Sequence, residues 1–350
     1  MGGKIKRLMP LHRHLCFLDV GHGNSTVIIA GKDSIVVVDV GRGRRHSALS
    51  EFFLEQEITH VQSIYLSHAD EDHIGGLLGI LAAQKVSIDY VYVNSDASKK
   101  SKVWGDLVYE LSCAHNADRL EFMVGRLVSG HREELPGSVS VEVLGPSQYL
   151  AARGVGSTNR SGAKIHTNSI SAVIAISVGS SRVALLPGDI DGVGLNDLFS
   201  NPQQDLCSRI LVYPHHGGFP GAGTTPEEYA KELLSKIGPN LVIFSIGRGM
   251  HSTPNPDTVR QLRQLLPQTR IVCTQLSEHC ADQLSAVSFT HLSKTFAAGR
   301  ERGACCGGTV VVPLDDVSAV QPQKDPHIKF IQNQAPTSLC HDHPPKTSST

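Results

Sequence analysis

The run His68-Ala69-Asp70-Glu71-Asp72-His73 is the stretch of sequence that decides the architecture of this chain. It follows an apolar, strand-like segment and precedes a pair of glycines. Its two histidines and two aspartates would be costly to bury this close together without a partner, and a bound cation removes that cost. The run therefore predicts a metal site at the end of a strand. Its spacing lets one loop serve two adjacent ions, with His68 and Asp70 on one ion and Asp72 and His73 on the other.

Length and charge limit the classes of protein to which the chain can belong. It has 350 residues and a formal net charge of −1, so there is no global field that attracts nucleic acid or a membrane surface. No apolar run approaches the roughly 18 residues that a membrane span needs, and the N-terminus lacks the apolar segment of a secretory signal. We therefore expect a cytoplasmic protein without membrane contact, whose eight cysteines are thiols or metal ligands rather than disulfides.

Strand-like and helix-like segments alternate along the chain, which predicts a layered α/β domain. We expect an N-terminal segment over residues 1–13, one large domain over 14–316 and a tail over 317–350. The tail is rich in Pro, Gln, Ser and Thr, a composition that is typical of disordered segments. We therefore expect the tail to be disordered.

Further candidate site residues also follow apolar runs, where an α/β sheet exposes functional groups. Asp189 comes after a buried-type strand and is suited to bridging two cations. Of the adjacent pair His215-His216, we expect His215 to bind metal and His216 to be its neighbour, where it could transfer protons. His251 could be a last ligand, a proton donor or a phosphate contact. His166 could complete the ligand set of the first ion.

Two aspartates, Asp19 and Asp39, each end an early strand. They are better placed to support a metal site than to bind the metal directly. We expect them to orient histidines or loop amides near the ions.

A second group of soft ligands lies in the C-terminal third of the chain and consists of Cys273, His279, Cys280 and Cys305, with Cys306 beside it. Four such ligands in two short segments could hold a structural zinc ion. The spacing is not that of a standard zinc finger, so ordinary buried thiols are the alternative interpretation.

Together these motifs resemble the metallo-β-lactamase superfamily and, within it, the hydrolase domain of the ComEC family of DNA-uptake channels. The resemblance covers roughly residues 14–275 and rests on the His68–His73 run, Gly188-Asp189, Pro214–Gly217, Phe17–Asn24 and Ser245–Gly247. It implies a four-layer αββα sandwich with a dinuclear metal site at one edge. The family usually carries Gln and Asp where this chain has His22 and Asn24.

The resemblance and the ligand set together predict a metal-dependent hydrolase, a phosphodiesterase or nuclease with two divalent ions, Zn²⁺ or Mn²⁺. A hydroxide shared by the two ions would attack phosphorus in line. Asp189 would bridge the ions and Asp72 would help to orient the nucleophile. His216 or His251 would protonate the leaving alkoxide. The expected substrate is nucleic acid, with a single strand favoured, or a small phosphodiester.

Two other functions remain open at this point. One is a hydrolase of a small ester, lactone or thioester, because the same fold supports many chemistries. The other is a binding or regulatory module with an idle site and a protein partner in a bacterial multi-gene system. The complete ligand set argues against the idle module.

Overall fold

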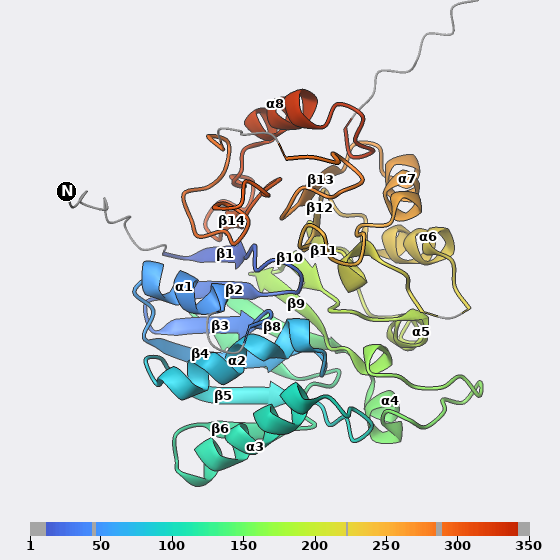
Figure 1. The fold of residues 1–350 in the computed structure, drawn as a ribbon. Coiled ribbons are helices and arrows are strands. Elements are labelled where there is room, and N and C mark those ends of the chain that lie inside the picture. Colours follow the sequence, from blue (N-terminus) through green and yellow to red (C-terminus); the bar gives the residue numbers. More distant parts are fainter. Residues whose placement is uncertain (1–11, 44–46, 222, 285–288, 342–350) are drawn as a thin grey trace, which may run out of the picture.

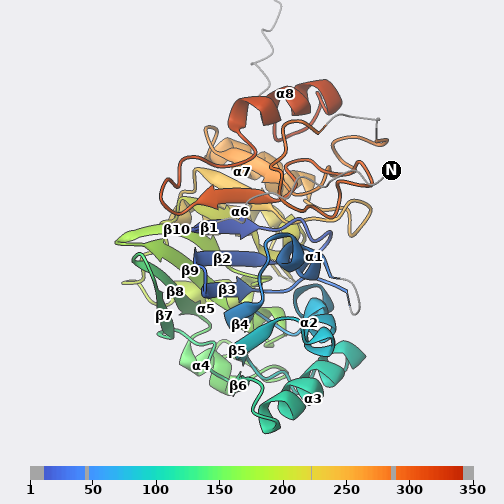
Figure 2. The ribbon, with the colours of Figure 1, turned by 90° about the vertical axis from the view of Figure 1, so that its left-hand side faces the viewer.

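The computed structural model describes residues 12–43, 47–221, 223–284 and 289–341, which form two facing seven-stranded sheets with helices on both outer faces. Figures 1 and 2 show the layers from two directions. The predicted α/β sandwich is therefore confirmed. The first sheet has the order β14-β1-β2-β3-β4-β5-β6, with bounds Val310–Pro313, His14–Phe17, Thr26–Gly31, Ser34–Val38, His60–Leu66, Ser87–Val93 and Glu121–Val124.

The second sheet repeats the mixed pattern of the first. Its order is β13-β12-β11-β10-β9-β8-β7, with bounds Arg270–Cys273, Leu241–Phe244, Ile210–Val212, Ser181–Leu186, Val173–Val178, Val139–Gly145 and Arg132–Leu135. Strands β10 to β13 are parallel, as are β3 to β6 in the first sheet. The carboxyl ends of these strands and the loops that follow them lie at one edge of the sandwich, where an α/β sheet builds its site.

The central strands are apolar on both faces because both faces are buried. In β2, Val27 and Ile29 pack toward the outer helices, while Ile28 packs into the core between the sheets. In β3, Val37 packs toward the outer helices and Val36 packs into the core between the sheets. Alternating side chains of a strand point to opposite faces, so a continuous apolar run fills two cores at once.

The outer helices bury one side against each sheet. In Figure 1, α1, α2 and α3 lie over the first sheet, with bounds Ala48–Glu55, Glu71–Ala83 and Lys102–Asn116. The second sheet is covered by α5, α6 and α7, with bounds Gly192–Phe199, Pro226–Ile237 and Pro256–Leu265. A short helix, α4, spans Gln148–Arg153, and two single-turn 3₁₀ helices span Asn168–Ile170 and Pro214–Gly217.

The expectation of a disordered tail is wrong for residues 317–341. Helix α8, Lys324–Gln334, packs on the outer core of the second sheet and buries His327, Phe330 and Ile331. These residues are spaced i, i+3 and i+4, which places them on one helix face. A composition count averages this stripe away among the polar residues. Residues 342–350, and all of the segment 1–13 except its last two residues, lie outside the described ranges.

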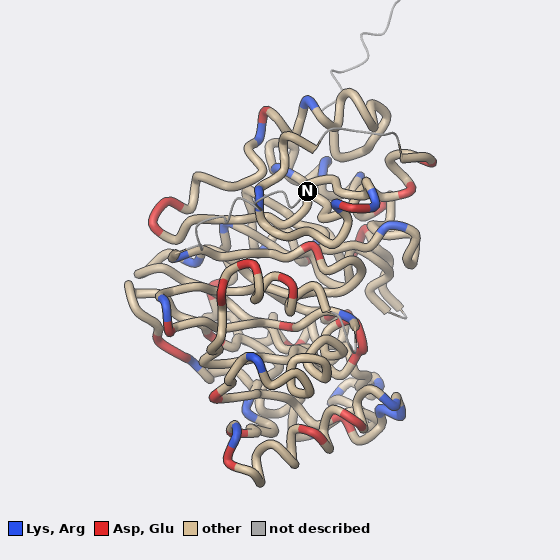
Figure 3. The backbone as a smooth tube through the Cα atoms, turned by 60° about the vertical axis from the view of Figure 1, so that its left-hand side comes forward, with Lys and Arg blue, Asp and Glu red and all other residues tan. Residues whose placement is uncertain are grey.

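Charged residues of both signs are interspersed along the chain, as Figure 3 shows. This distribution agrees with the net charge of −1. None of the helices in the described ranges combines the length and the apolar character that crossing a lipid bilayer requires.

Candidate metal centre

The side chains of the candidate centre come from both sheets and meet at the edge where the parallel strands end. Each lies just after a strand or in the first turn of a helix: His22 after β1, His68 after β4, Asp72 and His73 in α2, Asp189 after β10 and His216 after β11. Their ligand atoms form two groups, in each of which all ligand atoms lie within 4.8 Å of one another.

The first group consists of His68, His73 and Asp189, all of which are buried. The Nε2 atom of His73 lies 3.1 Å from Oδ1 of Asp189, and the Nε2 atom of His68 lies 3.8 Å from Oδ2. Two imidazole nitrogens and a carboxylate are a ligand set that Zn²⁺ and similar divalent ions accept.

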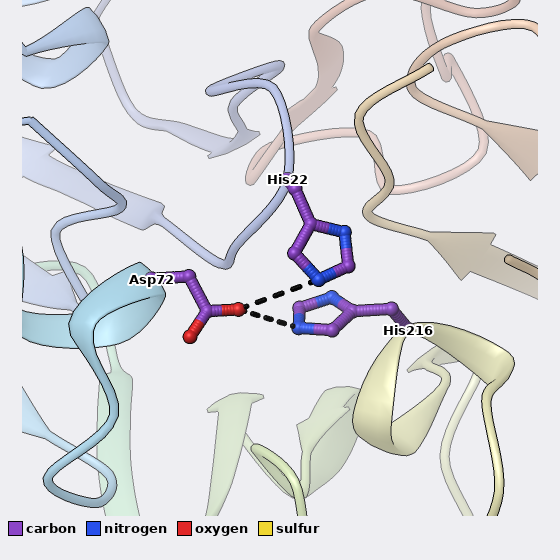
Figure 4. A group of neighbouring side chains, drawn as sticks. All are labelled: His22, Asp72 and His216. Carbon is purple, nitrogen blue, oxygen red and sulfur yellow. Dashed lines mark ion pairs between the residues drawn. The ribbon is translucent and has the colours of Figure 1, made fainter. Parts of the chain in front are cut away.

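The second group consists of His22, Asp72 and His216 and is shown in Figure 4. Both imidazoles direct Nε2 at the same carboxylate oxygen, Oδ2 of Asp72, at 3.5 Å from His22 and 3.2 Å from His216. The Nε2 atom of His216 is also 3.6 Å from Oδ2 of Asp189. Asp189 therefore lies between the groups, where the sequence predicted a bridging carboxylate.

Hydrogen bonds on the far side of two rings orient them for binding a cation. Nδ1 of His73 donates to Oδ2 of Asp39, and Nδ1 of His216 donates to the carbonyl oxygen of Ser245, each over 2.7 Å. A carboxylate or a carbonyl can only accept, so Nδ1 carries a proton, and in the neutral ring that binds a cation the Nε2 lone pair points into the centre. The expected supporting role of Asp39 agrees with this contact.

Five buried atoms of the centre make no hydrogen bond: Nε2 of His68, of His73 and of His216, Oδ1 of Asp189, and Nδ1 of His22. Buried polar atoms are almost always hydrogen-bonded in native proteins. The first four of these atoms converge on the two groups, so divalent cations fit the residues present. The two groups are consistent with a dinuclear metal site.

The charges of the centre depend on one another. Burial disfavours the charged form of Asp189, but the neighbouring His73 and His216 outweigh it and hold the pKa of this carboxyl well below its usual range. Burial also opposes the charged form of His73, but Asp189 and Asp39 outweigh it and raise the pKa of that ring. Burial and the nearby His216 lower the pKa of His22 to about 3, so His22 is neutral at pH 7. A neutral imidazole is the form that binds metal.

Asp70 lies beside the first group but outside it. Its Oδ2 is 3.7 Å from Nε2 of His68, while Oδ1 contacts the ammonium group of Lys99. Burial raises the pKa of Asp70, but His68 and then Lys99 outweigh this effect and lower the pKa to about 2. The carboxylate therefore joins the metal centre to a lysine of the neighbouring surface.

The pairing of ligands within the motif differs from the predicted one. We expected Asp72 and His73 on the same ion, but His73 belongs with His68, and Asp72 belongs with His216. Helix α2 already begins at Glu71. Successive residues of a helix point about 100° apart, so Asp72 and His73 face different groups.

The roles predicted for the histidine pair are reversed, because His216 rather than His215 belongs to a candidate group. Both residues have left-handed backbone conformations, with φ of 51° and 56°, and Gly217 follows at 76°. This turn directs the two rings differently. His216 is buried in the centre, and His215 lines a neighbouring cavity.

Two other predicted residues lie near the centre but in neither group. His166 is exposed and lines the same cavity as His215, while His251 is exposed and its ring centroid is 4.6 Å from that of His22. Asp19 has the expected supporting position, since its Oδ1 accepts a hydrogen bond from the amide of Gly21, beside His22.

The predicted structural zinc site does not form among the described residues, where the only candidate groups are the two above. Cys305 contacts Asp19 through its sulfur, and Nε2 of His279 donates to the carbonyl oxygen of Ser252. Cys273 and Cys280 pack with the outer core of the second sheet. The alternative interpretation, ordinary buried thiols, describes Cys273 and Cys305 correctly.

His22 is the site residue that sequence reasoning missed. In the sequence, His22 stands out only because the resembled family usually carries Gln at this position. The available signal was its position between Gly21 and Gly23, because two glycines allow a loop to approach other backbone closely.

A cavity of about 780 Å³ lies beside the centre. It is lined by polar, charged and apolar residues that include Asp70, Asp191, Lys99, Lys164 and His215. The centre therefore adjoins an open space whose lining includes the cations Lys99 and Lys164.

The fold and the two-group centre agree with one class of protein. The profile of the metallo-beta-lactamase superfamily matches residues 18–248, and the chain belongs to this superfamily. The chain is therefore a member of a family of metallo-hydrolases.

Among curated proteins the chain is similar to Recombination protein 2 of Haemophilus influenzae, with 26% identity over 235 residues. The matched region covers 66% of this chain and 24% of that protein, so the chain spans about a quarter of the length of this relative.

Two solved structures have a related fold. Igni18, a metallo hydrolase from Ignicoccus hospitalis, has a TM-score of 0.42 and 12% identity, covering 74% of this chain and 94% of its own. Zn²⁺-bound PqqB from Methylobacterium extorquens has a TM-score of 0.41 and 13% identity, and the match covers 74% of this chain and 97% of PqqB. These likenesses concern the fold alone.

Proposed function

We propose that this chain is a metal-dependent phosphodiesterase that acts on nucleic acid, with a single strand preferred. The observation that carries the proposal is the cavity beside the first group, whose wall holds Asp70 of the ligand run together with Lys99 and Lys164. Lysine ammonium groups pair with phosphate oxygens. A site for a lactone or an apolar ester would instead be expected to have a mostly hydrophobic lining.

The position of Lys99 is set by a buried carboxylate. Oδ1 of Asp96 accepts hydrogen bonds from the amides of Ser98 and Lys99, at 3.1 and 3.0 Å. Its Oδ2 accepts one, at 2.6 Å, from the hydroxyl of Thr167, which also lines the cavity. Asp96 thus links the segment that carries Lys99 to the one that carries Thr167. The ammonium group of Lys99 lies next to Asp70, where a phosphate at the metal centre would meet it.

Two further observations favour a single strand of nucleic acid. Along the described residues, Lys and Arg are interspersed with Asp and Glu (Figure 3), whereas the binding of a long duplex depends on many phosphate contacts. A single strand needs only a local groove with a few cations. The name of the relative Recombination protein 2 also refers to a process on nucleic acid.

Within this proposal, His68, His73 and Asp189 would hold one divalent ion, while Asp72 and His216 would hold the second. Bound Zn²⁺ or Mn²⁺ would supply Lewis acidity and lower the pKa of water. His216 then acts as a ligand, so His251 is the remaining candidate for protonating the leaving alkoxide. Lys99 would orient the phosphate by pairing with an oxygen.

The test compares metal-loaded wild-type protein with Asp189→Asn. Both are incubated with single-stranded DNA, RNA, bis(p-nitrophenyl) phosphate and a panel of lactones and thioesters. Cleavage of a single strand by the wild type that is lost in the variant supports the proposal. Turnover of lactones or thioesters alone contradicts it, and so does failure to cleave any phosphodiester with both ions bound.

A further inference from the structure

The loop that carries His22 is held firmly against the metal centre. A side chain on Gly23 would come within 2.1 Å of the carbonyl oxygen of Asp72, so the two backbones are in direct contact. The hydroxyl of Ser245, from the second sheet, donates to the carbonyl oxygen of Gly23 at 2.6 Å. A side chain on Gly247 would likewise meet the backbone nitrogen of His22, at 2.3 Å. Contacts from both sheets therefore position His22.

The imidazole of His22 has no partner that explains its burial. Only 7% of its side chain is exposed, and Nδ1 is buried without a hydrogen bond. Nε2 faces Oδ2 of Asp72 at 3.5 Å, which is too long for a good hydrogen bond. Its ring lies 4.3 Å from that of His216, centroid to centroid, and Figure 4 shows both rings directed at one carboxylate. This is the arrangement of ligands around a shared ion.

We propose that His22 is a metal ligand, the third protein ligand of the second ion after Asp72 and His216. The second position then has two imidazole nitrogens and one carboxylate, the same donor composition as the first group. Nitrogen donors suit Zn²⁺, whereas positions dominated by oxygen donors suit Mn²⁺ and Mg²⁺. His22 therefore makes the second position selective for Zn²⁺. The inference depends on the metal centre and not on the substrate.

The decisive variant is His22→Gln, which keeps a polar side chain of similar size but removes the imidazole. Metal-free proteins are loaded with Zn²⁺, passed through a desalting column and subjected to elemental analysis. We expect two equivalents in the wild type and one in His22→Gln, with the affinity for the second ion lowered by about tenfold or more. His251→Gln is the matched control for metal content, because its ring also contacts His22 but belongs to neither group.

Cobalt provides a readout that is independent of activity. Co²⁺ titration should produce two successive changes in the visible spectrum of the wild type, and the second should be lost in His22→Gln alone. Full retention of two Zn²⁺ ions with unchanged affinity would overturn the assignment. Loss of both ions to the same extent, with an unchanged melting temperature of the metal-free form, would overturn the placement at the second position.

A second variant keeps the proposal testable if His22→Gln does not fold. His22→Asp replaces the nitrogen with oxygen, so Mn²⁺ should compete with Zn²⁺ for the second position better than it does in the wild type. An unchanged preference for Zn²⁺ over Mn²⁺ would refute the role of His22. Because these measurements involve no substrate, they can succeed even if the phosphodiesterase proposal fails.

Discussion

Asp39→Asn is the substitution that tests most directly how the metal centre is built. Asp39 directly follows β3 and is 1% exposed. Its Oδ2 accepts from Nδ1 of His73 at 2.7 Å and from the hydroxyl of Ser67 at 2.8 Å, while Oδ1 accepts from the amide of Ser67 at 2.7 Å. Asparagine has the same shape and also tolerates the left-handed backbone found here, with φ of 57°. The substitution therefore changes the hydrogen bonding and the charge, with little change in packing.

The magnitude follows from these contacts. The asparagine amide has one accepting oxygen where the carboxylate of Asp39 has two. Whichever way the amide is turned, its NH₂ group therefore faces a hydrogen-bond donor of His73 or Ser67. If it faces His73, the ring proton is driven from Nδ1 to Nε2, the atom that points at Asp189. Loss of a hydrogen-bond partner of a metal ligand lowers metal affinity by about 10- to 100-fold, which equals about 1.4–2.7 kcal/mol. The metal-free protein should also lose about 1.5–3 kcal/mol of stability with the charged hydrogen bond.

The assay is competition for Zn²⁺ with a chelator, together with urea unfolding of the metal-free proteins. Asp89→Asn is the matched control, because Oδ2 of Asp89 contacts Nε2 of His60 at 3.0 Å on the exposed surface. We expect the control to match the wild type in Zn²⁺ affinity. Wild-type affinity in Asp39→Asn, or an equal loss in both variants, would show that Asp39 does not orient a metal ligand.

Three further predictions test other parts of the molecule. His216→Ala should lose one equivalent of Zn²⁺ in elemental analysis while His215→Ala keeps both, and the opposite result would restore the assignment first expected from the sequence. Lys99→Ala should raise the KM for single-stranded DNA by about fivefold, or about 1 kcal/mol, in steady-state assays, whereas Lys102→Ala, on the exposed start of α3, should not. Burial lowers the pKa of His327 to about 3, so its contribution to stability is present above pH 6.5 and is lost as the pH falls toward 3. Between pH 7 and 5, the free energy of unfolding of the wild type should therefore fall by about 2 kcal/mol more than that of His327→Gln, and parallel urea titrations would contradict this.

The sequence predicts the layers and the edge that holds the site because these depend on regular patterns. Apolar runs such as 35–38 predict strands buried on both faces, and a carboxylate such as Asp189 just after a strand predicts a ligand at the sheet edge. The choice between His215 and His216 does not follow a regular period. Both lie in a turn with left-handed backbone, so neither strand nor helix periodicity indicates which ring turns inward.

Long-range contacts explain the other differences from the sequence-based expectations. His22 reaches Asp72 only because the loop after β1 lies against the start of α2, a contact between segments fifty residues apart. Helix α8 folds because Phe330 and Ile331 find an apolar surface on the second sheet. Its polar composition alone would predict disorder. In both cases the deciding interaction lies outside the local sequence.

The origin of the ligands determines how metal binding is coupled to folding. The first sheet supplies His68 and His73 and the second supplies Asp189 and His216, so bound ions connect the sheets at one edge. The sheets are also joined by a continuous apolar core, unlike small zinc domains that unfold without metal. Chelation should therefore leave the fold intact but lower its melting temperature, because a ligand at 100 times its Kd stabilises the folded state by about 2.7 kcal/mol. Circular dichroism with and without chelator measures this difference, and complete unfolding on chelation would mean that the core between the sheets does not hold them together by itself.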